Sequence, residues 1–400
     1  MSEASFAVPG VRLGVAAAGI KYPDRQDMLV VELAAGGRAA AVFTRNAFCA
    51  APVHLARAHL QSTTPRYLLV NSGNANAGTG EQGMRDAESS CRYLAEVAGC
   101  RPEQVLPFST GVIGENLPLE RMQQAMPAAL ADLRIDGWEA AARAIMTTDT
   151  RPKLAERHFE IDGISARVVG IAKGAGMIRP DMATMLAYLA TDLAVDNSLL
   201  QACLEAAVEP SFNSITVDGD TSTNDACVLL ASATSSLPPV NSGQSEAYRR
   251  LAEAVSAVCL ELAREIVRDG EGATKLVEVV VEQAAGLAEA RKVAYTIAHS
   301  PLVKTALFAC DPNWGRILAA VGRADLQKLE IERVEIWLDH VCIVRDGGRA
   351  PEYTEAAGRS VMEKPEFRIR VRLGRGAVET RVLTCDLSYD YVRINAEYRT

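Results

Sequence analysis

The first candidate for chemistry is Thr184, which follows a glycine-rich turn and heads an apolar, helix-like run. Lys173-Gly-Ala-Gly-Met-Ile-Arg-Pro-Asp-Met-Ala-Thr184 leads into Met-Leu-Ala-Tyr-Leu-Ala190. An N-terminal threonine carries its own base, because its α-amine can take the proton from its hydroxyl. That amine is free only if the Ala183–Thr184 bond is cut. The alternative for a threonine in this position is a helix cap or a packed side chain.

A second candidate is the pair Thr110 and Gly111, within Ser109-Thr-Gly-Val-Ile-Gly114. Acyl transfer passes through a tetrahedral oxyanion, and each donor aimed at that oxygen contributes ~3 kcal/mol. Gly111 offers a backbone N–H without side-chain obstruction, and Thr110 offers a hydroxyl. The alternative is a plain turn between a strand and a helix.

Two charged residues beside glycines are candidates for substrate binding. Lys173 lies at the start of the glycine-rich turn, where its charge can hold a carboxylate. Glu271 lies between Gly270 and Gly272, where its carboxylate can pair with an ammonium group. The alternatives are a solvated lysine and an exposed loop acid, which are the usual states of these residue types.

The composition is that of an ordinary globular protein, and the length favours two or three structural units. It has 400 residues, of which 48% are hydrophobic and 23% charged. Its net charge of −8, from 42 basic and 50 acidic residues, argues against nucleic acid or an anionic membrane as the main partner. The nine scattered cysteines indicate reduced thiols rather than a disulfide framework.

The sequence does not support secretion, a membrane span, a metal site or a phosphate-binding loop. The start Met1-Ser-Glu-Ala-Ser lacks the pattern of a signal peptide, and no apolar run reaches the ~20 residues of a membrane span, so the expected compartment is the cytoplasm. The five histidines form no ligand-spaced set with cysteines, so no metal site is expected. Lys173-Gly-Ala-Gly176 lacks the spacing of a phosphate-binding loop.

Helices and strands alternate along the chain and would position these residues. Asp162-Gly163 between two apolar runs predicts a hairpin whose second strand ends near Lys173. Residues 28–43 predict two strands about the Gly36-Gly37 turn. Helical periodicity is found at Met84–Ala98, twice within 119–147, from Asp196 or Asn197 to Val208, at Glu246–Arg268 and at Leu287–His299. The chain after His299 is predicted to be mostly β, with strands at 334–338, 341–344, 367–373 and 382–387. This mixture predicts an α/β fold with mixed sheets layered with helices.

The glycine-rich string and six others resemble one family, the self-cleaving ornithine acetyltransferases of arginine biosynthesis (glutamate N-acetyltransferases). These strings span nearly the whole chain in one order, which makes them far more specific together than singly. The others are Asn71-Ser-Gly-Asn-Ala-Asn-Ala77, Ser109-Thr-Gly-Val-Ile-Gly114, Met146-Thr-Thr-Asp-Thr150, Val217-Asp-Gly-Asp-Thr-Ser-Thr-Asn-Asp225, Asp311-Pro-Asn-Trp-Gly-Arg316 and Asn395-Ala-Glu-Tyr-Arg-Thr400.

The resemblance implies an ornithine-acetyltransferase-like (DmpA/ArgJ-like) fold and a chain that cleaves itself between Ala183 and Thr184. Residues 1–183 would form an α chain and residues 184–400 a β chain, associated as a heterotetramer of two α and two β chains. Thr184 would be the nucleophile, with Thr110 and Gly111 as the oxyanion hole. The resemblance further implies substrate-binding roles for Thr147, Lys173, Thr184, Glu271, Asn395 and Thr400.

The implied activity is transfer of acetyl from N2-acetyl-L-ornithine to L-glutamate, giving L-ornithine and N-acetyl-L-glutamate through acetyl-Thr184. The reaction needs no cofactor, and some relatives also accept acetyl-CoA as a donor. One alternative is an N-terminal-nucleophile amidohydrolase or aminopeptidase, in which water replaces glutamate. Another is a non-catalytic metabolite-binding protein that keeps the fold, which an intact 400-residue chain in purified material would favour.

Overall fold

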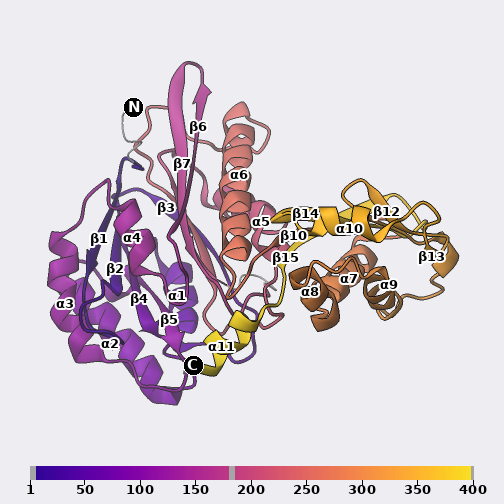
Figure 1. Cartoon of the computed structure of the whole chain (residues 1–400). Helices are drawn as coiled ribbons and strands as arrows, with labels where there is room; N and C mark the ends of the chain where they lie inside the picture. The colour runs from indigo at the N-terminus through magenta and orange to yellow at the C-terminus, as the bar shows by residue number, and fades with distance from the viewer. Residues whose placement is uncertain (1–5, 180–184, 398–400) are drawn as a thin grey trace, which may run out of the picture.

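Two sheets stacked face to face, with helices on both outer faces, form the larger of two bodies (Figure 1). The structure is a computed structural model that describes residues 6–179 and 185–397. One apolar core lies between the two sheets and one lies under each helical layer. The layered α/β architecture predicted from the sequence is therefore confirmed.

The first sheet has the strand order β1-β2-β4-β5 and comes entirely from the first part of the chain. β4 and β5 run parallel, so their ends at Asn74 and Val112 lie at the same edge. Buried side chains of α2, such as Cys91 and Leu94, cover the outer face together with α3. The elements are β1 (Val11–Ala16), β2 (Met28–Leu33), β4 (Tyr67–Asn74), β5 (Val105–Val112), α2 (Gly80–Ala98) and α3 (Leu119–Ala131).

The second sheet, in the order β3-β9-β8-β7-β6, combines strands from both sides of residues 180–184. β7 and β8 are antiparallel, with Lys173 opposite Leu186. The apolar run after Thr184 is therefore a buried strand and not helix-like, because a short continuous apolar run does not by itself distinguish the two. The predicted hairpin is confirmed, because Asp162 and Gly163 have φ of 51° and 77° between β6 and β7, as a tight two-residue turn requires. The strands are β3 (Arg38–Phe43), β6 (Lys153–Ile161), β7 (Ile164–Lys173), β8 (Leu186–Thr191) and β9 (Ala226–Ala231).

Residues 28–43 form two strands as predicted, but the strands join different sheets. β2 pairs with β1 and β4, whereas β3 pairs with β9. The Gly36-Gly37 turn therefore carries the chain from one sheet to the other. A side chain at Gly37 would meet Leu33 at 2.8 Å and the Ala231 carbonyl oxygen at 3.0 Å. The alternation of apolar residues predicts a strand but not its pairing partner.

Helices α5 (Asn197–Val208) and α6 (Glu246–Arg268) cover the second sheet. Ser245 begins α6 by accepting a hydrogen bond from the Tyr248 backbone N–H. Two further helices, α1 (Ala51–Ser62) and α4 (Trp138–Ala144), contribute to the core between the sheets. The helices predicted at Met84–Ala98, within 119–147 and at Glu246–Arg268 are thus present.

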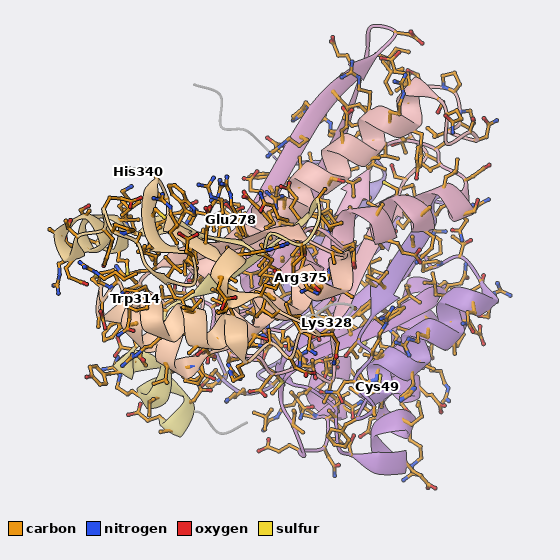
Figure 2. The ribbon with its side chains drawn as sticks, turned by 90° about the vertical axis from the view of Figure 1, so that its right-hand side faces the viewer. Cys49, Glu278, Trp314, Lys328, His340 and Arg375 are labelled. Carbon is orange, nitrogen blue, oxygen red and sulfur yellow. The ribbon has the colours of Figure 1, made fainter. Side chains whose placement is uncertain are left out.

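A third sheet and four helices form the second body, on the right of Figure 1. In Figure 2 Glu278, Trp314 and His340 lie on this body, while Cys49 lies on the larger one. The sheet has the order β13-β12-β11-β14-β10-β15. Its elements are β10 (Leu276–Ala284), α7 (Leu287–Ala298), α8 (Pro301–Phe308), α9 (Trp314–Gly322), β11 (Glu335–Leu338), β12 (Val341–Arg345), β13 (Gly348–Arg349), α10 (Glu355–Met362), β14 (Glu366–Arg372) and β15 (Val378–Cys385).

The prediction that the chain is mostly β beyond His299 is wrong. Helices α8, α9 and α10 have only eight or nine residues each, too short to show a clear helical period. Side chains of Ser300, Asn313 and Thr354 cap their N-termini. A last helix, α11 (Tyr389–Glu397), returns the chain to the larger body.

No helix in the described part of the chain is long and apolar enough to cross a membrane. All nine cysteines are free.

Candidate active site

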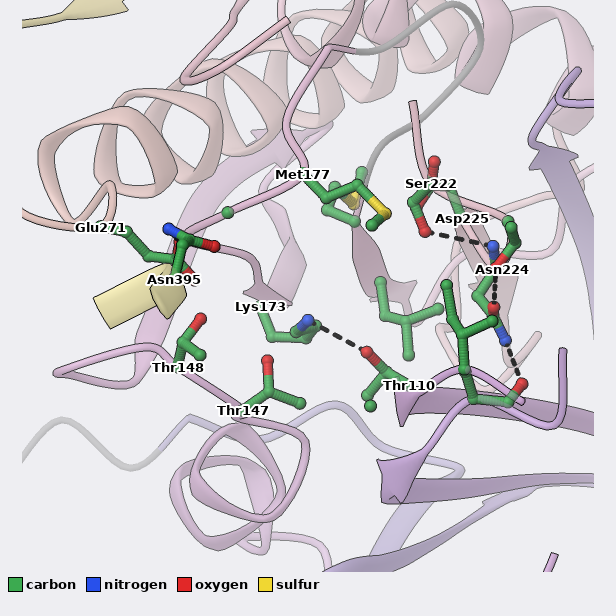
Figure 3. Close-up of a pocket in the computed structure, with 17 residues that line it drawn as sticks. Thr110, Thr147, Thr148, Lys173, Met177, Ser222, Asn224, Asp225, Glu271 and Asn395 are labelled. Atoms are coloured by element: carbon green, nitrogen blue, oxygen red, sulfur yellow. Dashed lines mark hydrogen bonds between the residues drawn. The ribbon is translucent and has the colours of Figure 1, made fainter. Parts of the chain in front are cut away.

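One cavity, of about 110 Å³, is lined by all the candidate residues that the structure describes (Figure 3). These residues lie at strand ends, in the loop after α4, in the turn after α6 and on the terminal helix α11. The lining includes Thr110, Gly111, Thr147, Thr148, Lys173, Met185, Ser222, Thr223, Asn224, Asp225, Glu271 and Asn395. Segments more than 200 residues apart in sequence, at Thr147 and Asn395, thus face one space. Ala183, Thr184 and Thr400 lie outside the described residues.

Thr110 and Lys173 are hydrogen-bonded to each other in this cavity. Thr110 lies near the end of β5 and Lys173 ends β7, and both side chains are buried. The Lys173 ammonium donates to Thr110 Oγ1 at 3.0 Å. Because the Thr110 oxygen accepts this bond, its own proton is available for a ligand oxygen. A positively charged neighbour also strengthens that donor, which suits a developing oxyanion.

Gly111 occupies a position where no other residue fits. Its φ is +135°, a conformation that favours glycine, and an added Cβ would lie 2.2 Å from the Gly73 carbonyl carbon. The close approach of β4 and β5 therefore requires glycine. A substitution here would disturb the sheet as well as the site, so Thr110 is the better residue for testing the oxyanion hole.

Replacing Thr110 by alanine is expected to lower kcat about 100-fold, because the oxyanion exists mainly in the transition state. KM should change by less than about twofold, a difference that steady-state kinetics resolves. Thr110→Ser keeps the hydroxyl and is the matched control, expected near wild-type kcat. An unchanged kcat in Thr110→Ala would remove this residue from the oxyanion hole.

Lys173 lies in a buried environment that opposes its charged form. Burial lowers the pKa of its ammonium, while Asp149 and Asp225 act in the opposite direction. The two carboxyl groups face Lys173 from different segments, one after α4 and one before β9. A substrate carboxylate entering the cavity would find this cation at its wall.

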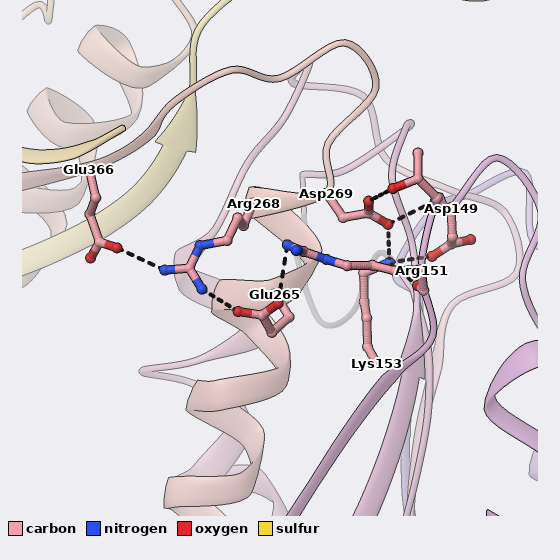
Figure 4. A network of polar contacts seen from close by, with 8 residues as sticks. Asp149, Arg151, Lys153, Glu265, Arg268, Asp269 and Glu366 are labelled. Atoms are coloured by element: carbon pink, nitrogen blue, oxygen red, sulfur yellow. Dashed lines mark hydrogen bonds and ion pairs between the residues drawn. The ribbon is translucent and has the colours of Figure 1, made fainter. Parts of the chain in front are cut away.

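A buried ion triad lies directly behind the site (Figure 4). The Lys153 ammonium lies 2.6 Å from a carboxylate oxygen of Asp149 and 2.6 Å from one of Asp269, and the three side chains are 0%, 0% and 3% exposed. Burial raises the pKa of Asp149, but Lys153 and Lys173 outweigh it and lower that pKa to about 2. Asp149 is therefore held in its ionised form at neutral pH.

The triad also connects the three segments that carry candidate residues. Asp149 accepts hydrogen bonds from the backbone N–H of Thr147 at 3.0 Å and of Gly174 at 2.7 Å. Asp269 accepts from the Thr150 backbone N–H at 3.1 Å and lies two residues before Glu271. Asp149, Lys153 and Asp269 thus position the site without lining its cavity. Sequence reasoning missed all three, although Asp149 belongs to the Met146–Thr150 string.

Asp225 is a third acid whose position in the site the sequence did not reveal. Its side chain lines the cavity, is buried, and has one oxygen, Oδ2, without a hydrogen-bond partner among the described residues. Burial raises its pKa well above the usual value, which favours the neutral acid. The string Val217–Asp225 contains three aspartates, and no local pattern indicates that this one is buried.

The terminal helix brings Asn395 onto Glu271. Asn395 Nδ2 donates to Glu271 Oε2 at 2.7 Å, and the Glu271 backbone N–H donates to the Ala175 carbonyl at 2.9 Å. An added Cβ at Gly176 would meet the Glu271 carboxylate at 2.5 Å, so the glycine-rich turn makes room for this acid. Glu271 is thus a half-buried loop acid rather than a fully exposed one, and Asn395 is an exposed residue of α11. Their roles toward a substrate stay predictions.

Among the described residues, no group of three or more histidine, cysteine or acidic side chains could hold a metal ion.

Comparison with known proteins shows the family to which the chain belongs. The ArgJ family model matches residues 12–400. A protein of Methylococcus capsulatus named "Arginine biosynthesis bifunctional protein ArgJ" is 62% identical over 395 residues, covering 98% of this chain and 96% of its own. Its namesake from Pseudomonas fluorescens is 54% identical over 393 residues, covering 98% and 97%.

A solved structure is similar over half of the chain. A chain of the Bacillus halodurans arginine biosynthesis bifunctional protein ArgJ is 38% identical, with a TM-score of 0.50, and the match covers 53% of this chain and 98% of that one. Since the family model and the relatives both match almost from end to end, this chain belongs to the ArgJ family.

Proposed function

We propose that this protein transfers acetyl from N2-acetyl-L-ornithine to L-glutamate through an acetyl ester on Thr184. The observation that carries the proposal is the single cavity in which Lys173, Thr110, Glu271 and Asn395 meet beside Met185, the first described residue after Thr184. The high identity to proteins named for arginine biosynthesis supports the pathway. The reaction requires no cofactor in this scheme, with acetyl-CoA as a second candidate donor. The proposed compartment is the cytoplasm.

Cleavage would come first. The Thr184 hydroxyl attacks the Ala183 carbonyl, the C–N bond breaks, and an ester forms that water hydrolyses. This step leaves a free α-amine on Thr184. The amine then takes the proton of the Thr184 hydroxyl as that oxygen attacks the acetyl carbonyl of the donor.

The transfer itself has two halves. In the first, Thr110 and the Gly111 N–H donate to the oxyanion, the acetyl C–N bond breaks, and the proton passes to the departing ornithine amine. In the second, the glutamate amine attacks the acetyl ester and releases the Thr184 hydroxyl. Lys173 holds the α-carboxylate of either amino acid, with Thr147, Asn395 and Thr400 as neutral partners.

The fold is compatible with two chains that stay together after cleavage. β8 and β9 would belong to one chain, while their neighbours β7 and β3 would belong to the other. The buried Lys153–Asp269 ion pair would join the same two chains. The Bacillus halodurans chain, which corresponds nearly whole to about half of this one, is what a cleaved relative would present. We propose a heterotetramer of two α and two β chains.

The proposal is tested by the dependence of ornithine release on glutamate. Purified enzyme with N2-acetylornithine should release ornithine over many turnovers only when glutamate is present, and N-acetylglutamate should form in equal amount. Rapid release with water alone would identify an amidohydrolase instead. No release at all would indicate a binding protein that keeps the fold.

Glu271→Gln is expected to impair the acetylornithine half-reaction more than the glutamate half-reaction. Ornithine carries a side-chain ammonium that the Glu271 carboxylate can pair with, whereas glutamate has no such group. Glutamine can still accept the hydrogen bond from Asn395, so the local geometry is kept. A loss of about 30-fold in first-turnover ornithine release, near 2 kcal/mol, is expected for one charge-assisted bond.

The measurement separates the two halves. Ornithine release is followed in the first turnover, and acetyl transfer to glutamate is followed from preformed acyl-enzyme. Glu96→Gln, at an exposed position on α2, is the matched control and should change neither. Equal losses in both halves would show that Glu271 serves the chemistry or the architecture.

A further inference from the structure

A second and larger cavity, of about 740 Å³, is rich in cationic side chains and has no role in the reaction described above. It lies where the loop after α5, helix α7 and the end of α9 meet the residues before position 180. Five lining residues are cationic, namely Arg45, Arg179, Arg291, Lys292 and Arg323, and a single lining residue, Glu209, is acidic. Counting these charges gives 5 − 1 = +4 in a protein whose net charge is −8.

Internal partners neutralise only part of this charge. Arg291 pairs with Glu209, which also accepts from Asn213 Nδ2 at 2.9 Å. Lys292 lies 2.8 Å from Asp325, a carboxylate that is 83% exposed and outside the lining. Arg323 donates to the Thr296 carbonyl at 3.3 Å, a neutral group. No described carboxylate pairs with Arg179, so the cavity keeps an excess of positive charge.

His299 lines the cavity, and the surrounding positive charge acts on its imidazole. Its Nε2 lies 3.0 Å from Thr216 Oγ1, and its ring lies 5.2 Å from that of Tyr295. Burial, followed by the charges of Arg179 and Lys304, lowers the pKa of His299 to about 4. An anion bound beside Arg179 in the cavity would relieve the repulsion that this cation imposes on the imidazolium.

We propose that this cavity binds a small molecule that carries several phosphate groups. Guanidinium groups pair with phosphate through two parallel hydrogen bonds, and four of the five cations are arginines. A single carboxylate would leave most of the charge unbalanced, whereas a chain of two or three phosphates matches it. The volume suits a ligand of nucleotide size.

Two sources of such phosphates fit the position of the cavity. One is a free nucleotide that occupies only this cavity. The other is the nucleotide end of a coenzyme A thioester, whose acyl arm would extend toward the catalytic cavity, because Arg179 lies only two residues from Met177, which lines that cavity. The phosphate site itself does not depend on the proposed acetyl transfer.

Isothermal titration calorimetry on the full protein at low salt tests the proposal, with coenzyme A, ATP and inorganic pyrophosphate as separate probes. At least one probe should bind, and its affinity should fall as salt rises. Arg179→Gln and Arg323→Gln should each weaken binding about tenfold, the loss expected for one charge-assisted phosphate contact. Arg92→Gln, at an exposed site on α2, is the matched control and should bind like wild type. Circular dichroism checks that each variant is folded.

A second readout places the ligand without relying on variants. The chain has five histidines, so the imidazole signals can be resolved by NMR, and His299 should shift on binding. Binding of coenzyme A alone would assign the site to an acyl donor, and binding of all three probes would assign it to polyphosphates in general. The proposal is overturned if no probe binds at millimolar concentration, or if both arginine variants bind with wild-type affinity and the His299 signal stays in place.

Discussion

Purified protein is expected to run as two bands on a denaturing gel, of 183 residues and of 400 − 183 = 217 residues, whereas Thr184→Ala runs as one. The hydroxyl of Thr184 is the group that attacks the Ala183 carbonyl in the proposed cleavage, and alanine has none. The same variant should lose all measurable acetyl transfer, because it has neither the nucleophile nor a free amine. N-terminal sequencing of the 217-residue fragment should give Thr-Met-Leu.

Thr184→Ser is the control for this experiment. Serine keeps a hydroxyl of similar nucleophilicity, so cleavage and part of the activity should remain. Cleavage of Thr184→Ala at the same bond would mean that another protease cuts the chain, and the nucleophile assignment would be wrong. An uncut but fully active wild type would contradict the amine as base.

Lys153→Met is expected to lower the free energy of unfolding by about 3–5 kcal/mol, since it removes the ammonium group that pairs directly with two buried carboxylates. Asp149 and Asp269 each lie 2.6 Å from the Lys153 ammonium, and their side chains are 0% and 3% exposed. Urea unfolding of the variant and the wild type measures the difference. Activity should fall too, because Asp149 holds the backbone of Thr147 and Gly174.

The pH dependence of this loss has a definite sign. The folded pKa of Asp149 is lowered to about 2, below the ~3.9 of an unfolded aspartate. Its stabilising contribution is therefore complete above about pH 4 and is lost as the pH falls toward 2. In Lys153→Met the same acid neutralises the Asp149 carboxylate that has lost this lysine, so the difference between variant and wild type should shrink below about pH 4.

Lys292→Met provides the matched control for the triad. Lys292 pairs with Asp325 in solvent, with side chains 48% and 83% exposed, and exposed pairs contribute less than about 1 kcal/mol. Equal urea midpoints for Lys153→Met and wild type would show that the triad does not stabilise the fold.

Elements with strong local signals were predicted closely. The period of α6 extends over 23 residues, and Asp162-Gly163 permits the positive φ of a hairpin turn, so neither required knowledge of the rest of the chain. Helices α8 to α10 escaped prediction because eight or nine residues hold barely two turns. The strand pair β2 and β3 shows a further limit, since each strand was correct but the sheet that each joins was not predictable.

The motif residues of the site were recognisable as strings, and their types alone specify much of the chemistry that is available: hydroxyl, ammonium, carboxylate and unobstructed backbone N–H. The strings did not reveal which of these groups lie close together in the folded protein. Asn395 contacts Glu271 across 124 positions of sequence, and Lys153 contacts Asp269 across 116.

The charge states of Asp149 and Asp225 also depend on which groups the fold brings together. Both are buried aspartates, but one has a lysine at 2.6 Å and a lowered pKa, while the other has an unpaired oxygen and a raised one. Desolvation and Coulomb energies depend on burial and on distances between groups, and these exist only once the chain has folded.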